Sequence, residues 1–386
     1  ELDDPQPLQI SRDFRTAVAT RARSSRRWRS ALRAGSCLAV LAISLPLGYA
    51  AYEYHRLDDV HRLTIPSVGD GLPVITATPT SAPATGTVPA GGASPSTGPS
   101  LPAARREAST ILIVGSDERD TDAALGARYD TIMVVRLDPA SSRLTVLSIP
   151  RDLWLTGPSG TPSRINTLDA EALTSTIENL LNIQIDHFAQ VSFDGFKRLI
   201  NLVGGVSVTS DAALRDKNTG FTLAAATCTR LDGDQALAFV RSRHMQSDRN
   251  GKWVEDPRSD FGRIADQQLV MRALAQQLFA SLPGPTSIGD FVDAAVDDVT
   301  VDSGFSAQDM VSTALAVRRI GTAATQFATV QVSGKVIAGQ DVLVASSTQI
   351  SAAARFLADG TSAITPATPQ TSPSTTSSSV PVITAC

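Results

Sequence analysis

The sequence predicts a layered α/β domain with a central mixed β-sheet, preceded by one transmembrane helix. Two observations support this fold class. Between Ser109 and Gly360, short runs of β-branched and apolar residues alternate with segments of helical periodicity, as expected when helices cover a sheet. Upstream, an apolar stretch without charged residues follows a segment rich in arginine, which is typical of a membrane anchor.

The N-terminal part predicts a single-pass protein of the cell membrane. Residues 1–33 contain a block of arginines, and residues 34–52 are uncharged, with a length close to the ~20 residues that span a bilayer. Positive charge before the span predicts a cytoplasmic N-terminus and an extracytoplasmic domain. A cleaved signal peptide is the alternative, because small residues occur near the end of the apolar run.

Two low-complexity segments frame the predicted domain, which covers residues 109–360. Residues 53–108 are expected to be a linker, since most of them are Pro, Gly, Ser, Thr and Ala and cannot form a packed core. Residues 361–386 repeat this composition and are expected to be a tail. The net charge of −4 excludes nucleic-acid binding by overall electrostatics.

Three strands are predicted at the start of the domain. Residues 110–114 form a continuous apolar run, and 131–137 and 143–149 are rich in β-branched residues. The turn sequence Asp-Pro-Ala-Ser joins the second and third runs. These two strands should therefore form a hairpin centred near Ala140.

Acidic and guanidinium groups are expected to converge at one rim of this sheet. Asp130 and Arg151 fall almost opposite each other at the open end of the hairpin, and Asp117 and Arg119 are expected to leave the preceding strand at the same end. Such a group suits a metal ion held beside phosphate. A surface salt-bridge cluster is the structural alternative.

A second group of arginines follows a short helix downstream. Asp232 or Asp234 can cap a helix that runs through Phe239, and Arg241 and Arg243 emerge after it.

On a later helix, Arg263 and Gln267 are four residues apart and share one face. If one pocket held all the arginines of both groups, their positive charges would repel one another unless a polyanion were bound. The planar guanidinium group suits phosphate oxygens. These arginines are Arg119, Arg128, Arg151, Arg241, Arg243 and Arg263.

The remaining pattern predicts scaffold elements and one disulfide. Helices are expected at 173–181, from Asp194 to the glycine pair 204–205, at 306–319 and at 347–357, and strands at 206–209 and 329–332. Cys228 and Cys386 both lie on the predicted outer side, where oxidising conditions permit them to pair.

Several of these segments, in order, resemble the motifs of the LytR-CpsA-Psr family. They are GSDERD, RYDTIMVVRLDP, LSIPRD, IDHFAQVSFDGFKRLINLVGGVSV, LDGDQALAFVRSRH and D-x-G-R-x-x-x-Q-Q, between about Ser109 and Gln277. The sequence departs from the family pattern at two positions near the predicted site. Tyr129 stands where a small residue is more usual, and Asp266 stands where arginine is common.

The resemblance implies an α/β/α domain that binds a polyprenyl pyrophosphate lipid and attaches anionic glycopolymers to the cell wall. It implies Mg²⁺ as cofactor, with Asp117 and Asp130 as its ligands. It places Arg119, Arg128, Arg151, Arg241, Arg243, Arg263 and Gln267 around the pyrophosphate. Arg151, Arg241 and Arg243, with the two aspartates, would carry the chemistry.

The expected reaction moves a glycan-1-phosphate from the polyprenyl pyrophosphate carrier to a hydroxyl of peptidoglycan at the membrane surface. Two alternatives remain open. One is a module that binds the lipid carrier without chemistry, and the other is a pyrophosphatase that releases polyprenyl phosphate to water.

Overall fold

A computed structural model describes residues 56–66, 68, 107–116, 128–281, 299–321, 324–360 and 380–386. The predicted cytoplasmic segment, the predicted membrane span and most of the predicted linker lie outside these residues. Among the helices that are described, none has both the length and the apolar character needed to cross a membrane.

A mixed sheet forms the centre of the fold, as the sequence predicted, and it has seven strands. Its strands, in spatial order, are β1 (His61–Leu63), β14 (Val299–Asp302), β7 (His187–Ser192), β2 (Ser109–Ser116), β3 (Tyr129–Asp138), β4 (Arg143–Ser148) and β15 (Thr325–Thr329). The pairs β1/β14, β2/β7 and β4/β15 are parallel, and the other neighbours are antiparallel. Both edge strands are short.

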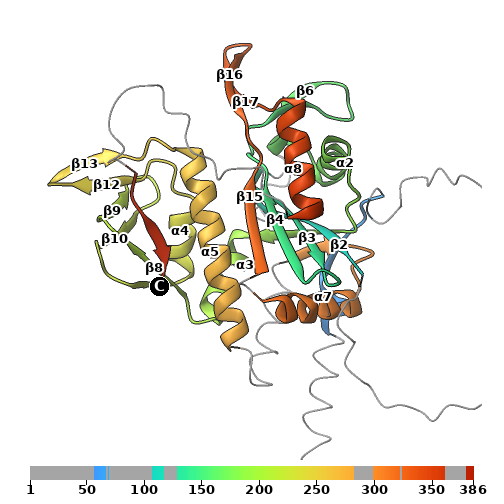
Figure 1. Cartoon of the computed structure of the whole chain (residues 1–386), viewed down its shortest axis with the longest axis horizontal. Helices are drawn as coiled ribbons and strands as arrows, with labels where there is room; N and C mark the ends of the chain where they lie inside the picture. The colour runs from blue at the N-terminus through green and yellow to red at the C-terminus, as the bar shows by residue number, and fades with distance from the viewer. Residues whose placement is uncertain are drawn as a thin grey trace, which may run out of the picture. The chain divides into compact units, whose positions relative to one another are not determined.

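Helices cover both faces of this sheet (Figure 1). On one face, α2 (Ala170–Leu181) and α8 (Ser347–Asp359) pack against a core that includes Leu112 and Val134. On the other face, α7 (Ala307–Ile320) packs against Leu137. Because side chains alternate along a strand, each buried strand supplies apolar residues to both layers.

A second layer of helices and small sheets follows β7. Its helices are α3 (Phe193–Leu202), α4 (Gly233–Val240) and α5 (Asp260–Ser281). Its strands are β8 (Val206–Ser210), β9 (Leu214–Asp216), β10 (Phe221–Leu223), β11 (Thr229–Leu231), β12 (Gln246–Arg249), β13 (Lys252–Glu255) and β18 (Ile383–Ala385). The strands form two sheets, of order β10-β9-β12-β13 and β11-β8-β18, and the layer shares one apolar core.

Short elements complete the described chain. Two are 3-10 turns, η1 (Leu57–Asp59) and η2 (Ile165–Thr167), and two are small hairpins, β5 (Trp154–Thr156) with β6 (Pro162–Arg164) and β16 (Ser333–Ile337) with β17 (Gln340–Val344). Figure 1 shows the β16–β17 hairpin projecting from the helices and strands around it.

Local sequence explains where the helices near the site begin. Asp232 caps α4 by accepting from the backbone N–H of Gln235, whose side chain in turn accepts from the N–H of Asp232. This capping box confirms the predicted helix start. At Gly233 a Cβ would lie 2.4 Å from the backbone oxygen of Lys197, so glycine lets α4 approach α3 closely.

Most expected helices and strands differ from the structure by a few residues at their ends, and three short strands differ more. The strand expected at 329–332 is β15, Thr325–Thr329, because its hydrogen-bonding partner β4 already ends at Ser148. Two three-residue strands, β1 and β18, lie inside the predicted linker and tail. Only their pairing with β14 and β8 makes them strands, and runs this short give no periodicity from which to predict them.

Candidate active site

The open end of the β3–β4 hairpin brings Asp130 and Arg151 together. The last ladder pair is Met133 with Ser148, and the same register continues to Asp130 and Arg151. The Arg151 guanidinium donates from Nη1 to the Asp130 carboxylate. Their side chains are only 15% and 19% exposed. This charge-assisted contact between partly desolvated groups fixes the geometry of the rim.

The first turn of α5 contributes a buried guanidinium to the same rim. The side chain of Arg263 is 2% exposed. Its Nε and Nη2 lie 3.0 and 2.8 Å from Oδ1 of Asp260, and its Nη1 donates to the backbone oxygen of Asp130 at 2.8 Å. A buried guanidinium is tolerated only when its N–H groups find acceptors. Arg263 therefore fixes α5 against β3.

Two carboxylates that sequence reasoning missed, Asp152 and Asp260, lie among the arginines. Nε of Arg243 lies 3.4 Å from Asp260, and its Nη2 lies 3.8 Å from Asp152. Asp152 is also 3.7 Å from Nε of Arg151 and 3.6 Å from Nε of Arg164. The signal was present, because Asp152 ends the segment LSIPRD and Asp260 begins D-x-G-R.

These residues form what we call the arginine cluster: Arg151, Arg164, Arg241, Arg243 and Arg263 with Asp130, Asp152 and Asp260. Five guanidiniums meet three carboxylates, so the excess positive charge is smaller than the sequence suggested. Within the described part of the chain, no carboxylate pairs with Arg241, whose guanidinium lies 4.5 Å over the ring of Phe193. Arg241 is thus the clearest donor for an anionic ligand.

An apolar cavity of about 210 Å³ adjoins the arginine cluster. It lies between strands β2, β3 and β7 and helices α3, α4 and α5. Its lining residues are Ile113, Val114, Gly115, Asp130, Thr131, Met133, Val191, Ser192, Phe193, Phe196, Leu199, Leu237, Val240, Arg241, Arg263, Gln267, Met271 and Leu274. The charged members all belong to the arginine cluster. A ligand with an anionic head and a hydrocarbon tail matches this distribution.

Nine residues were expected around the metal and the pyrophosphate. Six of them belong to the arginine cluster or line the apolar cavity: Asp130, Arg151, Arg241, Arg243, Arg263 and Gln267. Arg128 is exposed just before β3. Asp117 and Arg119 lie outside the described residues. The neighbouring glutamine has a separate task, since Gln268 donates to Ser148 and to the backbone oxygen of Ala328 and so ties α5 to the sheet.

Asp216 positions the loop that carries Arg243. Its carboxylate accepts from the hydroxyl of Ser242 at 2.5 Å and from the backbone N–H groups of Arg243 and His244 at 3.2 and 3.0 Å. Burial by itself would raise the pKa of Asp216, but these hydrogen bonds, with those from Asn218 and Thr219, hold it below its usual value. Asp216 therefore acts as a fixed anion beneath the loop.

Comparison with known proteins identifies the family. The model of the LytR_cpsA_psr family matches residues 82–358, which is more than half of the chain. The chain belongs to this family. A teichoic acid transferase of Bacillus anthracis, named polyisoprenyl-teichoic acid–peptidoglycan teichoic acid transferase TagU, is 34% identical over 201 residues. That match covers 50% of this chain and 60% of the transferase, so this chain spans less than two thirds of its relative.

Solved structures share the fold of this chain. The LytR-Csp2A-Psr enzyme from Actinomyces oris has a TM-score of 0.54 at 24% identity, covering 67% of this chain and 95% of that one. TagV of B. subtilis has a TM-score of 0.54 at 23% identity, covering 66% and 96%. The layered architecture with a central mixed sheet is therefore that of the family.

Both departures from the LytR-CpsA-Psr motifs are buried. Tyr129 is 2% exposed and belongs to the core between the sheet and α2. Asp266 is 4% exposed. Burial raises the pKa of Asp266 well above its usual value, Asp256 raises it further, and Arg258 opposes the shift. Neither residue lines the apolar cavity.

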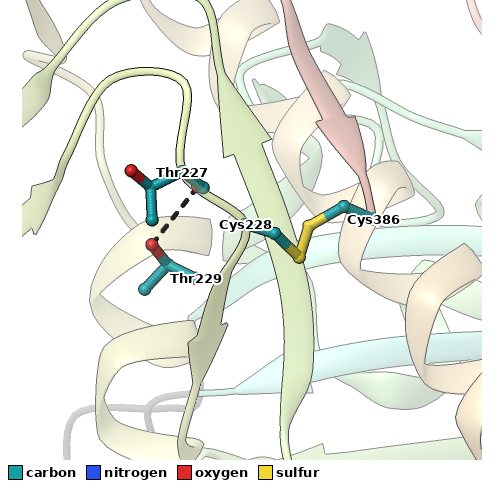
Figure 2. Close-up of a disulfide and its surroundings, with 4 residues drawn as sticks. All are labelled: Thr227, Cys228, Thr229 and Cys386. Carbon is teal, nitrogen blue, oxygen red and sulfur yellow. Dashed lines mark hydrogen bonds between the residues drawn. A yellow bond between two sulfur atoms is a disulfide. The ribbon is translucent and has the colours of Figure 1, made fainter.

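A disulfide joins Cys228, within the family match, to Cys386, which lies beyond it. Cys228 and Cys386, which the sequence paired, are bonded in the structure, with Cα atoms 5.9 Å apart (Figure 2). Cys386 directly follows β18, which pairs with β8 and contributes Ile383 to the core shared by α3, α4 and α5. The disulfide therefore attaches the C-terminus to the layer that forms one wall of the apolar cavity.

Proposed function

We propose that this protein transfers a glycan-1-phosphate from a polyprenyl pyrophosphate carrier to a hydroxyl of peptidoglycan. The observation that carries the proposal is the contact between the arginine cluster and the apolar cavity. The cavity accommodates part of a hydrocarbon chain, and the arginines bind the pyrophosphate to which that chain is attached. The name of the Bacillus anthracis relative, a teichoic acid transferase acting on peptidoglycan, supports the same substrate classes.

In the proposed reaction, an acceptor hydroxyl oxygen bonds to the phosphorus that carries the glycan. The bond from this phosphorus to the bridging oxygen breaks, and polyprenyl phosphate departs with the electron pair and, in the net reaction, with the hydroxyl proton. Arg241 and Arg151 would bind the phosphate oxygens and stabilise charge on the departing phosphate. Arg263 would hold the rim in place through its contacts with Asp130 and Asp260.

A magnesium ion fits the donor chemistry of this rim. The carboxylate of Asp130 is an oxygen ligand of the kind that Mg²⁺ prefers, and Asp117 would supply a second. When bound, the ion would neutralise charge on the pyrophosphate. Among the described residues, no three acidic, histidine or cysteine side chains are arranged so that they could hold a metal ion by themselves, so substrate phosphates and water would complete the coordination.

The decisive experiment incubates the purified full-length chain with a polyprenyl pyrophosphate-linked glycan and measures released polyprenyl phosphate. Release should require Mg²⁺, stop with EDTA, and fall strongly in Asp117→Ala and Asp130→Ala. Turnover that persists in the double aspartate variant with EDTA would contradict the metal-assisted chemistry.

The same assay distinguishes the transferase from the two alternatives, a binding module and a pyrophosphatase. A binding module would retain the lipid without turnover. A pyrophosphatase would release polyprenyl phosphate equally well without peptidoglycan. A transferase should instead accelerate when peptidoglycan is added and should attach the glycan to it.

The proposed location is the outer face of the cell membrane. The lipid carrier is confined to the bilayer, so an anchor at residues 34–52 would keep the apolar cavity near it. The arginine block before this stretch supports a cytoplasmic N-terminus.

A further inference from the structure

A second cleft, of about 520 Å³, borders the arginine cluster. Three segments form its walls: Asp152 and Arg243 of the cluster, the turn 257–261 that leads into α5, and both strands of the β16–β17 hairpin. We propose that this cleft binds the sugar units of the acceptor glycan strand. The inference rests on the proposed function and assigns the acceptor's place in it.

The arginine cluster lies between the cleft and the apolar cavity. Asp152, Arg243 and Asp260 line the cleft, whereas Asp130, Arg241 and Arg263 line the cavity, and no residue lines both. The bond between Arg263 and Asp260 joins the two sets. A pyrophosphate bound at the cluster can therefore extend its lipid into the cavity while its other side faces the cleft.

The geometry of phosphoryl transfer then selects the acceptor rather than the donor for the cleft. In this reaction the attacking and leaving oxygens lie roughly in line through the phosphorus. The leaving oxygen belongs to the lipid phosphate, which points toward the apolar cavity. The attacking hydroxyl must approach from the opposite side, and the cleft is the space that opens there.

The side chains of the cleft favour a neutral polyhydroxyl ligand. Its acidic members are Asp152, Asp260 and Asp341, and its basic members are Arg243, Arg258 and Lys335. These charges balance, so a polyanion would meet as many carboxylates as cations. Sugar hydroxyls both donate and accept hydrogen bonds and can use both kinds of group.

Apolar surface within the cleft suits the C–H faces of sugar rings. Val336, on the hairpin, is 66% exposed. Phe261, at the start of α5, lines the same cleft. Both side chains line the same cleft as the balanced charges, so a sugar ring bound there could contact apolar and polar groups together.

The hairpin wall is attached directly to the reacting site. The backbone N–H of Leu343 donates to the oxygen of Asp152 at 3.0 Å, and Arg164 donates to the backbone oxygen of Asp341 at 3.0 Å. Asp152 follows Arg151 in the chain. A glycan held by the hairpin would therefore have a defined position relative to the phosphate held by Arg151.

The test fills the cleft without touching the arginine cluster. Gly334 lines the cleft, and a Cβ built there meets nothing within 4 Å, so Gly334→Tyr should fold normally and occupy ligand space. Gln340→Tyr is the matched control, because Gln340 is exposed on the same hairpin and does not line the cleft. Equal melting temperatures of both variants and the native chain would verify folding.

Kinetics on the full-length chain should separate acceptor from donor. With soluble uncrosslinked glycan strands as acceptor, Gly334→Tyr should raise the KM for acceptor at least about tenfold, equivalent to roughly 1.4 kcal/mol. The donor KM and the release of polyprenyl phosphate without acceptor should stay unchanged, and Gln340→Tyr should change nothing. An unchanged acceptor KM, or an equal rise in the donor KM, would overturn the proposal.

A binding measurement keeps the inference independent of turnover. Chitotetraose, a neutral amino-sugar probe, should bind the native chain without donor, and Gly334→Tyr alone should weaken that binding. If the native chain released no polyprenyl phosphate but bound chitotetraose in this way, the proposed reaction would fail and the cleft assignment would stand. Binding that is absent, or insensitive to Gly334→Tyr, would refute the assignment.

Discussion

The side chains of the arginine cluster are positioned mainly by ion pairs and hydrogen bonds with one another. Arg151 contacts Asp130, Asp152 and Asp260, and Arg263 contacts Asp130 and Asp260. Removing one member leaves partly buried charges without their partner, which costs more than the contact itself contributes. Substitutions here should therefore alter binding and catalysis together.

Arg151 gives the sharpest prediction at this scale. Arg151→Ala should weaken both lipid binding and turnover, because it removes a charge-assisted phosphate contact of roughly 1.5–3 kcal/mol. Arg151→Lys should recover only part of the loss, since an ammonium cannot make the bidentate contact. Arg318→Ala, at an exposed position of α7, is the control and should behave as the native chain. Lipid affinity and released polyprenyl phosphate are the measurements.

Asp216 gives a prediction about pH. Its folded-state pKa is lowered, so its contribution to stability is present above the unfolded pKa of about 3.9 and is lost as pH falls through the folded value. Asp216→Asn should therefore reduce the free energy of unfolding at pH 7 by about 1.5–3 kcal/mol. The difference from the native chain should shrink below about pH 4. Urea unfolding at pH 7 and pH 3 measures both values, and a difference independent of pH would contradict this account.

At the scale of elements, the strand β18 is attached by its ladder with β8, by hydrogen bonds between Val382 and Asp211, and by the disulfide. Ile383 packs against the core behind the apolar cavity. Loss of the disulfide should therefore weaken the attachment of β18 and loosen the cavity wall, even though Cys386 is far from the arginine cluster in sequence.

The disulfide prediction is a loss of stability. The bond closes a loop with a sequence separation of 158 residues, for which chain entropy predicts about 4–5 kcal/mol, less if the strand stays docked. Cys228→Ser, Cys386→Ser and the double variant should lower the unfolding free energy by similar amounts, since each removes the same bond. Peptide mapping without reductant checks the bond itself, and free thiols at both positions would refute it.

At the scale of the whole molecule, the proposed anchor and linker determine where the domain works. A protease added to cells without an outer barrier should cut the linker between Ile65 and Ala104 and release the domain. The N-terminal segment should remain protected, because the arginine block predicts that it is cytoplasmic. An epitope tag at each end follows both fragments. A protected domain would mean that the orientation, and with it the cell-wall function, is wrong.

The sequence by itself determined the parts of this protein that depend on local pattern. The strands around Asp130 and Arg151 follow from β-branched runs and a turn signal, and the hairpin register set these two residues opposite each other. The sequence placed the start of α4 at Asp232 or Asp234, and the capping box in the structure decides for Asp232. Motif order pointed to the family, which the comparison confirmed.

Only the tertiary structure decided which distant groups meet. Asp152 and Asp260 belong to segments far apart in the chain, and only folding brings both to Arg243. The same holds for β1 and β18, which become strands through pairing, and for the β16–β17 hairpin, which forms a cleft wall because Leu343 bonds to Asp152. Periodicity reports which face of an element is apolar, whereas the partner that covers that face is chosen by packing across the whole chain.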